Sequence, residues 1–260
     1  MGHRRLNEVK FQERVTPLKD HTAVFQSHYA TYKFAVQFVK GAKVLDVASG
    51  TGYGSALLSQ YCDSCVGIDL SSEAIAYARN NYKAVNLDFF VMDLMSLGFQ
   101  NESFGVACSF QAIEHVKDCE LHLSEISRVL SPDGLFLLST PNKDFSLSGA
   151  SPVLNIYHVK EFTLNELDRL LRRYFNSVEI FGQSLDKNIR FSLEQNPLKK
   201  QVARFDVLNL RKMMSSWCRR RLANASGTLV EEDISFKDFV ISKDDLRHCE
   251  NFVAVCKDKI

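Results

Sequence analysis

The sequence lacks the features of a membrane, secreted or strongly charged protein. It has no run of roughly 18 apolar residues, the length that a membrane-spanning helix requires, so we predict no such helix. Residues 1–10 are charged and contain no apolar stretch, so we expect no signal peptide. The 32 basic and 31 acidic residues leave a formal net charge of +1, and this balance gives no reason to expect nucleic acid as a partner.

The seven cysteines also lack a recognisable pattern. Cys62 and Cys65 form a C-x-x-C pair, but no second pair follows at the spacing of a zinc site. Redox or zinc chemistry at this pair is an alternative to the simpler interpretation, which is a set of buried or surface thiols. Free thiols are typical of a reducing compartment, so we expect a cytoplasmic protein.

Short apolar runs alternate with amphipathic segments along the chain, and this alternation is typical of βαβ units with a mostly parallel sheet. The 260 residues are 45% hydrophobic and 24% charged, which fits one α/β domain with an insertion. We therefore expect a Rossmann-like α/β fold, with helices on both faces of a seven-stranded sheet. The predicted strands cover residues 43–47, 65–69, 88–92, 104–110, 135–139, 178–181 and 252–256, and predicted helices cover residues 22–39 and 118–130. Another helix begins at a capping box formed by Thr163 and Glu166.

We predict three segments along the chain. A helical lead covers residues 1–40, a core combines 41–183 with 251–260, and a helical insertion covers 184–250. Within the insertion, residues 198–222 have helical periodicity and many basic side chains, which form either the solvated face of a helix or a patch for phosphate groups. The basic residues are Lys199, Lys200, Arg204, Arg211, Lys212, Arg219, Arg220 and Arg221.

Three predicted strands end in an aspartate, namely Asp46, Asp69 and Asp93. In a doubly wound sheet ligands bind beyond the carboxyl ends of the strands, so we expect these carboxylates to lie around one ligand. Gly50 and Gly52 follow the first strand and let a ligand approach the backbone closely. Asp69 is placed to accept hydrogen bonds from ribose hydroxyls, and Asp93 from an adenine amino group. The pattern predicts a ligand with adenine, ribose and an aminoacyl tail.

A dinucleotide-binding dehydrogenase is an alternative interpretation of the glycine loop. Its fingerprint is G-x-G-x-x-G or A, whereas Ser55 stands three residues after Gly52. The sequence shows no second nucleotide-binding half, and this favours a mononucleoside ligand.

Several segments resemble, in order, the motifs of class I methyltransferases, in particular their ubiquinone-type branch. VLDVASGTG (residues 44–52) resembles the first motif and SFGVACSFQAIEHV (103–116) the fourth-strand motif, which EISRVLSPDG (125–134) and STPN (139–142) continue. One departure is Ala48, where the family usually has glycine. The resemblance implies an enzyme with S-adenosylmethionine as its cofactor. The implied cofactor-binding residues are Asp46, Ala48, Ser49, Gly50, Gly52, Asp69, Leu70, Asp93, Leu94 and Gln111.

A narrower resemblance concerns the acceptor. The segments ERV (13–15), SHY (27–29), NIYHVKEF (155–162) and GQ (182–183) resemble bacterial methyltransferases found with glycosyltransferases for surface polysaccharide. This implies O-methylation of a sugar or another small hydroxyl acceptor, so the expected partner is a small molecule or a glycan. The sequence predicts no oligomeric state.

Methylation of a hydroxyl requires a base for its proton. His115 follows the fourth strand at the ligand edge of the sheet, and His158 lies in a segment that can fold over the pocket. We predict a catalytic set of His115, Glu114 and His158, with His115 as the first candidate for the base and His158 as the second, because histidine titrates near neutrality. Glu114 and Glu161 are expected to orient the histidines. The structural alternatives are a helix cap for His115, a surface loop for His158 and a solvated carboxylate for Glu114.

The same residues resemble the metal-ligand set of small-RNA 2′-O-methyltransferases and ubiquinone O-methyltransferases. Those families carry a further glutamate where this sequence has Gln111, a neutral and weaker ligand for a hard cation, so we assign no metal. An RNA or quinone O-methyltransferase with a divalent metal is the alternative. A non-catalytic methyltransferase-like protein that binds partners through the insertion is another, although the intact glycine loop argues against it.

Overall fold

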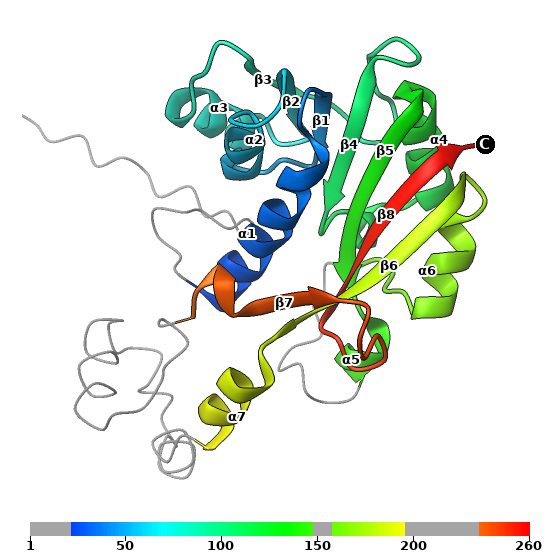
Figure 1. Ribbon diagram of the computed structural model, residues 1–260. Helices are drawn as coiled ribbons and strands as arrows, with labels where there is room; N and C mark the ends of the chain where they lie inside the picture. Colours follow the sequence, from blue (N-terminus) through cyan, green and yellow to red (C-terminus); the bar gives the residue numbers. More distant parts are fainter. Residues whose placement is uncertain (1–21, 148–157, 196–233) are drawn as a thin grey trace, which may run out of the picture.

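The computed structural model describes residues 22–147, 158–195 and 234–260. These residues form one eight-stranded sheet in the order β3-β2-β1-β4-β5-β8-β6-β7, flanked by helices (Figure 1). The strands from β3 to β5 are parallel, and β8, β6 and β7 are each antiparallel to the strand beside them. The expected Rossmann-like α/β fold is confirmed.

The elements have the following bounds. The strands are β1 (Lys43–Val47), β2 (Ser64–Asp69), β3 (Leu87–Val91), β4 (Phe104–Phe110), β5 (Leu130–Pro141), β6 (Phe175–Leu185), β7 (Phe239–Ser242) and β8 (Asn251–Lys259). The α-helices are α1 (Ala23–Ala35), α2 (Tyr53–Leu58), α3 (Ser72–Asn81), α4 (Cys119–Val129), α5 (Lys143–Leu147), α6 (Leu164–Leu171) and α7 (Lys187–Gln195). Short 3-10 helices are η1 (Val36–Phe38), η2 (Ile113–His115) and η4 (Phe236–Asp238).

The strand order reverses at β1, which pairs with β2 on one side and β4 on the other. Asp46 of β1 lies opposite Gly67 of β2 and Cys108 of β4. In such a sheet the ligand site lies beyond the carboxyl ends of the strands at this switch point. Ala48 and Gln111, which follow β1 and β4, therefore mark the place where a ligand is expected.

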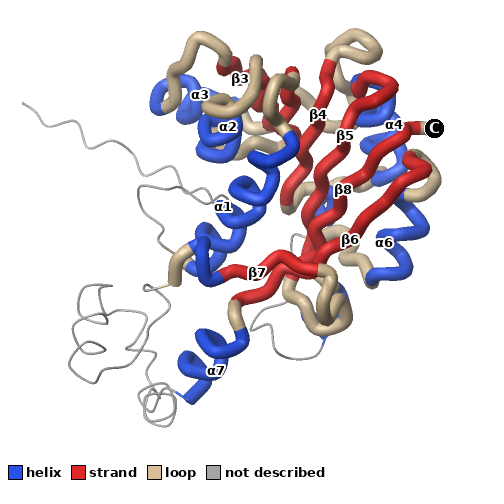
Figure 2. The backbone as a smooth tube through the Cα atoms, viewed as in Figure 1, coloured by secondary structure: helices blue, strands red, loops and turns tan. Residues whose placement is uncertain are grey.

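Helices cover both faces of the sheet, as Figure 2 shows. α1, α2 and α3 pack on one face and bury side chains such as Tyr32 and Ile75, whereas α4 and α6 bury side chains such as Ile126 on the other. Val44 and Leu45, successive residues of β1, belong to the two different cores. Strands buried on both faces must be apolar throughout, which explains the continuous apolar runs in the sequence.

Side-chain caps fix where several helices begin. Ser71, Asp118 and Thr163 each accept a hydrogen bond from a backbone N–H in the first turn of α3, α4 and α6. The predicted capping box of Thr163 and Glu166 is confirmed. Each such cap stabilises its helix by about 1 kcal/mol, because it satisfies a backbone N–H that has no partner within the helix.

The structure adds a strand to the predicted seven. β7 pairs with β6 at the edge of the sheet, within the segment predicted as a helical insertion. β5 begins earlier than predicted, but its pairing with β4 moves from Leu130 directly to Leu135, so residues 131–134 stand out of the ladder. The predicted helix over residues 198–222 and its basic side chains lie outside the described residues.

Two further predictions concern the cysteines and the membrane. Cys62 is half-buried and Cys65 is buried, and both are free thiols. Within the ranges that the structure describes, no helix combines the length and the apolar character needed to cross a bilayer.

Candidate cofactor and active site

The glycine loop leads from β1 to α2 through left-handed backbone. Ala48, Gly50 and Gly52 have φ values of 60°, 55° and 85°. A Cβ on Gly52 would lie 2.6 Å from the Cβ of Ala78 and 2.8 Å from the Phe89 ring, so only glycine fits there. A Cβ on Gly50 would meet nothing within 4 Å, so the backbone at this point faces open space. Ala48 adopts the same conformation without the freedom of glycine, at a cost of about 1 kcal/mol.

Asp69, at the end of β2, ties the glycine loop to α3. Its Oδ2 accepts a hydrogen bond from the Gly50 N–H at 3.0 Å, and its Oδ1 accepts one from the Ser71 N–H at 2.8 Å. Next to this tie, Ser49 Oγ is buried and has no hydrogen-bond partner among the described residues. Because a buried hydroxyl without a partner is unfavourable, its position in this loop indicates that a ligand completes the site.

Asp46 lies beneath the loop and has no exposed surface. Its carboxylate oxygens accept hydrogen bonds from the Tyr32 hydroxyl at 3.1 and 3.2 Å, and Oδ2 also accepts one from Ser55 Oγ at 2.6 Å. Burial raises the pKa of Asp46 to about 7, against the opposing effect of these hydrogen bonds. The Tyr32 ring packs directly over Gly54, where an added Cβ would overlap ring atoms. Asp46 therefore links Tyr32 of α1 to Ser55, just after the glycine loop.

The exits of β2 and β3 present an apolar and an acidic side chain. Leu70, directly after β2, is 67% exposed. Asp93 is exposed after β3, and its Oδ1 accepts a hydrogen bond from the Met95 N–H at 2.9 Å. Since β2 and β3 are neighbours in the sheet, these side chains are suited to the face and the amino edge of a purine.

Gln111 leaves β4 with a φ of 51°, a left-handed conformation in a residue other than glycine. Its Nε2 donates to Ser139 Oγ at 3.2 Å and to Asn251 Oδ1 at 3.4 Å. Asn251 Nδ2 in turn donates to Gln183 Oε1 at 3.2 Å, and Gln183 Nε2 donates to the carbonyl oxygen of Ser27 at 2.8 Å. This network joins the exit of β4 to β5, β8, β6 and α1, so the Gln111 side chain is held in one orientation.

The three residues predicted as catalytic come together beyond β4. Glu114, His115 and His158 each have one oxygen or nitrogen atom that lies within 4.8 Å of the corresponding atoms of the other two. The two imidazole centroids are 5.0 Å apart and the rings are inclined by 75°. His158 Nδ1 lies 2.7 Å from Glu161 Oε1. The fold thus brings the exit of β4 and the segment before α6 to one place.

Glu114 is the buried member of this group and holds it together. Its Oε2 accepts a hydrogen bond from Thr140 Oγ1 at 3.0 Å, whereas Oε1 is buried with no partner in the described part of the chain. Burial raises the pKa of Glu114 to about 8, so its neutral form predominates at pH 7. The Glu114 carbonyl oxygen accepts from the N–H groups of Val159 and Lys160 at 2.8 and 3.2 Å, which places His158 beside His115.

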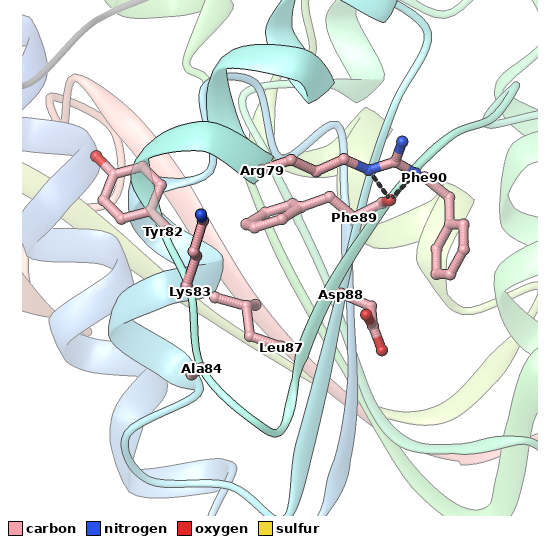
Figure 3. Close-up of a pocket in the computed structure, with 8 residues that line it drawn as sticks. All are labelled: Arg79, Tyr82, Lys83, Ala84, Leu87, Asp88, Phe89 and Phe90. Atoms are coloured by element: carbon pink, nitrogen blue, oxygen red, sulfur yellow. Dashed lines mark hydrogen bonds between the residues drawn. The ribbon is translucent and has the colours of Figure 1, made fainter.

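A pocket of about 360 Å³ lies at a different place, between α3 and the edge strand β3, and Figure 3 shows the residues that line it. Arg79 crosses it and donates from Nε to the carbonyl oxygen of Phe89 at 2.9 Å. None of the predicted site residues lines this pocket. The pocket therefore belongs to the flank of the sheet and not to the strand exits around the glycine loop.

Sequence reasoning missed the residues that support the site. Tyr32 and Ser55 hold Asp46, Thr140 holds Glu114, and Asn251 orients Gln111. All are buried or half-buried polar side chains. Tyr32 lies inside a predicted helix, whereas Thr140 and Asn251 lie next to the predicted strands 135–139 and 252–256. A polar residue on an otherwise apolar face was the available signal, although that signal does not name the partner.

The comparisons with known proteins agree with this geometry. Residues 45–138 match the family described as a methyltransferase domain. A probable S-adenosylmethionine-dependent methyltransferase of Mycolicibacterium smegmatis is 33% identical over 160 residues, which cover 61% of this chain and 62% of that protein. A ubiquinone biosynthesis O-methyltransferase of Rhizobium johnstonii is 25% identical over 167 residues, which cover 63% of this chain and 67% of that protein.

Solved structures share the fold at low sequence identity. A possible histamine N-methyltransferase from Thermotoga maritima has a TM-score of 0.59 and 14% identity, and the match covers 90% of this chain and 92% of the other. The [4+2]-cyclase SpnF has a TM-score of 0.54 and 16% identity, over 92% of this chain and 82% of the other. One fold therefore carries different chemistries, and the acceptor must be argued from the site. Together, these observations show that residues 45–138 are similar to a methyltransferase domain and that the described chain has the fold of S-adenosylmethionine-dependent methyltransferases.

Proposed function

We propose that this chain is an S-adenosylmethionine-dependent O-methyltransferase that acts on a hydroxyl of a sugar or another small acceptor. The observation that carries the proposal is the group formed by Glu114, His115 and His158 beyond β4, the strand next to β1 and its glycine loop. The glycine loop and the candidate base thus follow two neighbouring strands, β1 and β4. This placement suits a reaction whose main requirement is that an acceptor oxygen and a methyl carbon meet in line.

The residues around the glycine loop fit the cofactor. Gly50 faces open space, Ser49 Oγ has no partner among the described residues, and Asp93 is exposed at the adjacent strand exit. When bound, S-adenosylmethionine supplies a methyl group on a positively charged sulfur. Asp69 and Asp93 would accept hydrogen bonds from its ribose hydroxyls and its adenine amino group, and Ser49 would contact it through the loop.

His158 is the side chain best oriented to act as the base. The Glu161 carboxylate beside Nδ1 holds the imidazole proton on that nitrogen, so Nε2 is the basic one. His158 Nε2 would take the proton of the acceptor hydroxyl, whose oxygen would receive the methyl group that bound S-adenosylmethionine would supply, with the carbon–sulfur bond breaking and S-adenosylhomocysteine as the leaving group. Glu161 would stabilise the imidazolium that results. His115, which is exposed and touches the His158 ring, would contact the acceptor.

The test is transfer of labelled methyl groups from S-adenosylmethionine to nucleotide sugars and lipid-linked glycans. We expect label in a sugar fraction, and His158→Gln should lower kcat by about 100-fold or more, the usual effect of removing a general base. The dissociation constant of S-adenosylhomocysteine should stay unchanged in this variant, because His158 belongs to the acceptor side of the site. Glu161→Gln should lower kcat by a smaller factor.

A matched control is present in the same chain. His248 pairs with Asp245 at the same sequence spacing as His158 with Glu161, but His248 is 78% exposed. His248→Gln should leave kcat unchanged. Label in RNA or quinone would contradict the sugar acceptor, and absence of both label and cofactor binding would favour a non-catalytic protein.

A second candidate function is an RNA or quinone O-methyltransferase with a divalent metal, and the same group of side chains favours it. Glu114 Oε1 is buried without a partner in the described ranges, and a cation beside His115 and His158 would satisfy it. The fit is partial, because the Gln111 amide is held by Ser139 and Asn251 and is neutral. Metal content by mass spectrometry and turnover on quinone and RNA acceptors test this candidate. Turnover that survives exhaustive chelation contradicts it.

A further inference from the structure

A buried histidine outside the catalytic group connects the exits of two strands. His122, on α4, has no exposed surface. Its Nδ1 lies 3.2 Å from the carbonyl oxygen of Leu94, in the loop after β3, and its Nε2 lies 3.3 Å from Ser109 Oγ on β4. A carbonyl oxygen only accepts, so Nδ1 carries the proton and Nε2 accepts from the Ser109 hydroxyl. Burial lowers the pKa of His122, so this neutral tautomer persists at pH 7.

The peptide unit that His122 holds also reaches Asp93. The Leu94–Met95 peptide is planar, so fixing its carbonyl group fixes the direction of its N–H. That N–H, of Met95, donates to Asp93 Oδ1 at 2.9 Å, and the Ser96 N–H donates to the Asp93 carbonyl oxygen at 3.2 Å. A continuous chain of contacts therefore runs from α4 through one peptide unit to the exposed Asp93 carboxylate.

We propose that His122 is a positioning residue of the cofactor site, which orients the Asp93 carboxylate toward the amino group of adenine by fixing the Leu94–Met95 peptide. The inference rests on the proposed function, since Asp93 meets an adenine only if the cofactor binds at these strand exits. His122 itself touches neither cofactor nor acceptor. It acts through Leu94 on the affinity and selectivity of the adenine pocket.

Packing alone does not account for a histidine at this position. The neighbours of His122 on the buried face of α4 are Cys119, Leu123 and Ile126, all apolar, and an apolar side chain would fill the same space. A buried imidazole is unfavourable unless its nitrogens are hydrogen-bonded. Both nitrogens have partners here, and the partners belong to the exits of β3 and β4 rather than to α4 itself.

Three substitutions of His122 test its hydrogen bonds with Leu94 and with Ser109 separately and together. His122→Asn retains a donor near the position of Nδ1 and loses the contact with Ser109, whereas His122→Gln retains a polar atom near Nε2 and loses the contact with Leu94. His122→Phe loses both while keeping a ring. Ser109→Ala is the matched control, because it removes the Nε2 contact and leaves the Leu94 contact in place.

The experiment measures the dissociation constants of S-adenosylhomocysteine and of its inosine analogue, in which an oxygen replaces the adenine amino group. For the unaltered protein we expect adenine to be preferred. His122→Gln and His122→Phe should weaken S-adenosylhomocysteine binding about tenfold, the usual size of such a contact, and reduce the preference. His122→Asn and Ser109→Ala should stay within about threefold of the unaltered protein. Urea unfolding without ligand checks that each variant is folded.

The outcomes are distinguishable. Loss of adenine preference in folded His122→Gln and His122→Phe, with His122→Asn retaining it, supports the inference. If these variants bind both ligands as the unaltered protein does, the inference is overturned while the proposed function stands. Failure of the unaltered protein to bind S-adenosylhomocysteine overturns the proposed function and the inference with it. A parallel loss of affinity for both ligands in all variants also overturns it, because a merely structural role would have that effect.

Discussion

Replacing Asp46 by asparagine should make the ligand-free protein more stable at alkaline pH. Asp46 is fully buried, and burial raises its pKa from 3.8 to about 7. Between these pH values the folded chain keeps a proton that the unfolded chain releases, so the free energy of unfolding falls as the pH rises. The contribution is fully present below pH 3.8 and is lost as the pH passes through about 7. Asparagine has no ionisation and avoids this loss.

The magnitude follows from the same pKa values. A rise from 3.8 to about 7 corresponds to on the order of 4 kcal/mol, at 1.36 kcal/mol for each pH unit. Asparagine can accept a hydrogen bond from Ser55 Oγ and donate one to the Tyr32 hydroxyl oxygen, so both neighbours keep partners. We expect Asp46→Asn to exceed the unaltered protein by roughly 2 to 4 kcal/mol at pH 8.5 and by little at pH 4.5.

Urea unfolding of both proteins at several pH values between 4.5 and 8.5 measures this difference. Groups other than Asp46 are common to both proteins and cancel in the comparison. Asp63→Asn, at an exposed aspartate, is the control and should leave the pH dependence unchanged. A difference in the free energy of unfolding between Asp46→Asn and the unaltered protein that does not vary with pH would refute the reasoning.

The same Asp46→Asn variant should bind the cationic cofactor more weakly, because the carboxylate charge is gone.

Glycines in and near the cofactor loop give two further predictions. Gly50→Ala and Gly41→Ala, both at positive φ with open space around an added Cβ, should each destabilise the chain by about 1 kcal/mol. Only Gly50→Ala should also weaken S-adenosylhomocysteine binding in calorimetry, and equal affinities would place the cofactor elsewhere. Gly54→Ala, whose Cβ would overlap the Tyr32 ring, should lower the free energy of unfolding by about 3 kcal/mol, as severe overpacking does. Gly105→Ala, with its nearest contact at 3.5 Å, should change the urea midpoint little, and comparable losses in both variants would contradict this account.

The strand exits were predictable because local patterns determine them. Asp46 and Asp69 were expected to end the first two strands, and the structure has β1 reach Val47 and β2 end at Asp69. A strand buried on both faces is largely apolar, so an acid that closes such a run marks a position at or next to its end without any knowledge of the fold. Gly50 and Gly52 have the left-handed backbone that glycine adopts readily, and their place after the first strand was visible in the sequence.

Contacts between distant segments were not predictable in this way. Helical periodicity places Tyr32 on the buried face of its helix, but it does not say which strand residue the hydroxyl meets. β7 was missed because four residues at a sheet edge carry too little alternation to be separated from a helix. His122 stands in an apolar face, and only the folded chain shows that Leu94 and Ser109 lie beside it.

β8, the last described strand in chain order, lies inside the sheet between β5 and β6. Within the described residues, the sheet therefore joins β6 and β7 to the parallel strands through β8, a segment that is far from β5 in sequence. Pairing of such distant segments is slow, because a long loop must close before the contact forms. Until β8 inserts, β5 and β6 each present an open edge to other strands. At high concentration a refolding chain should thus be prone to accept the β8 segment of a second copy, which would yield domain-swapped dimers.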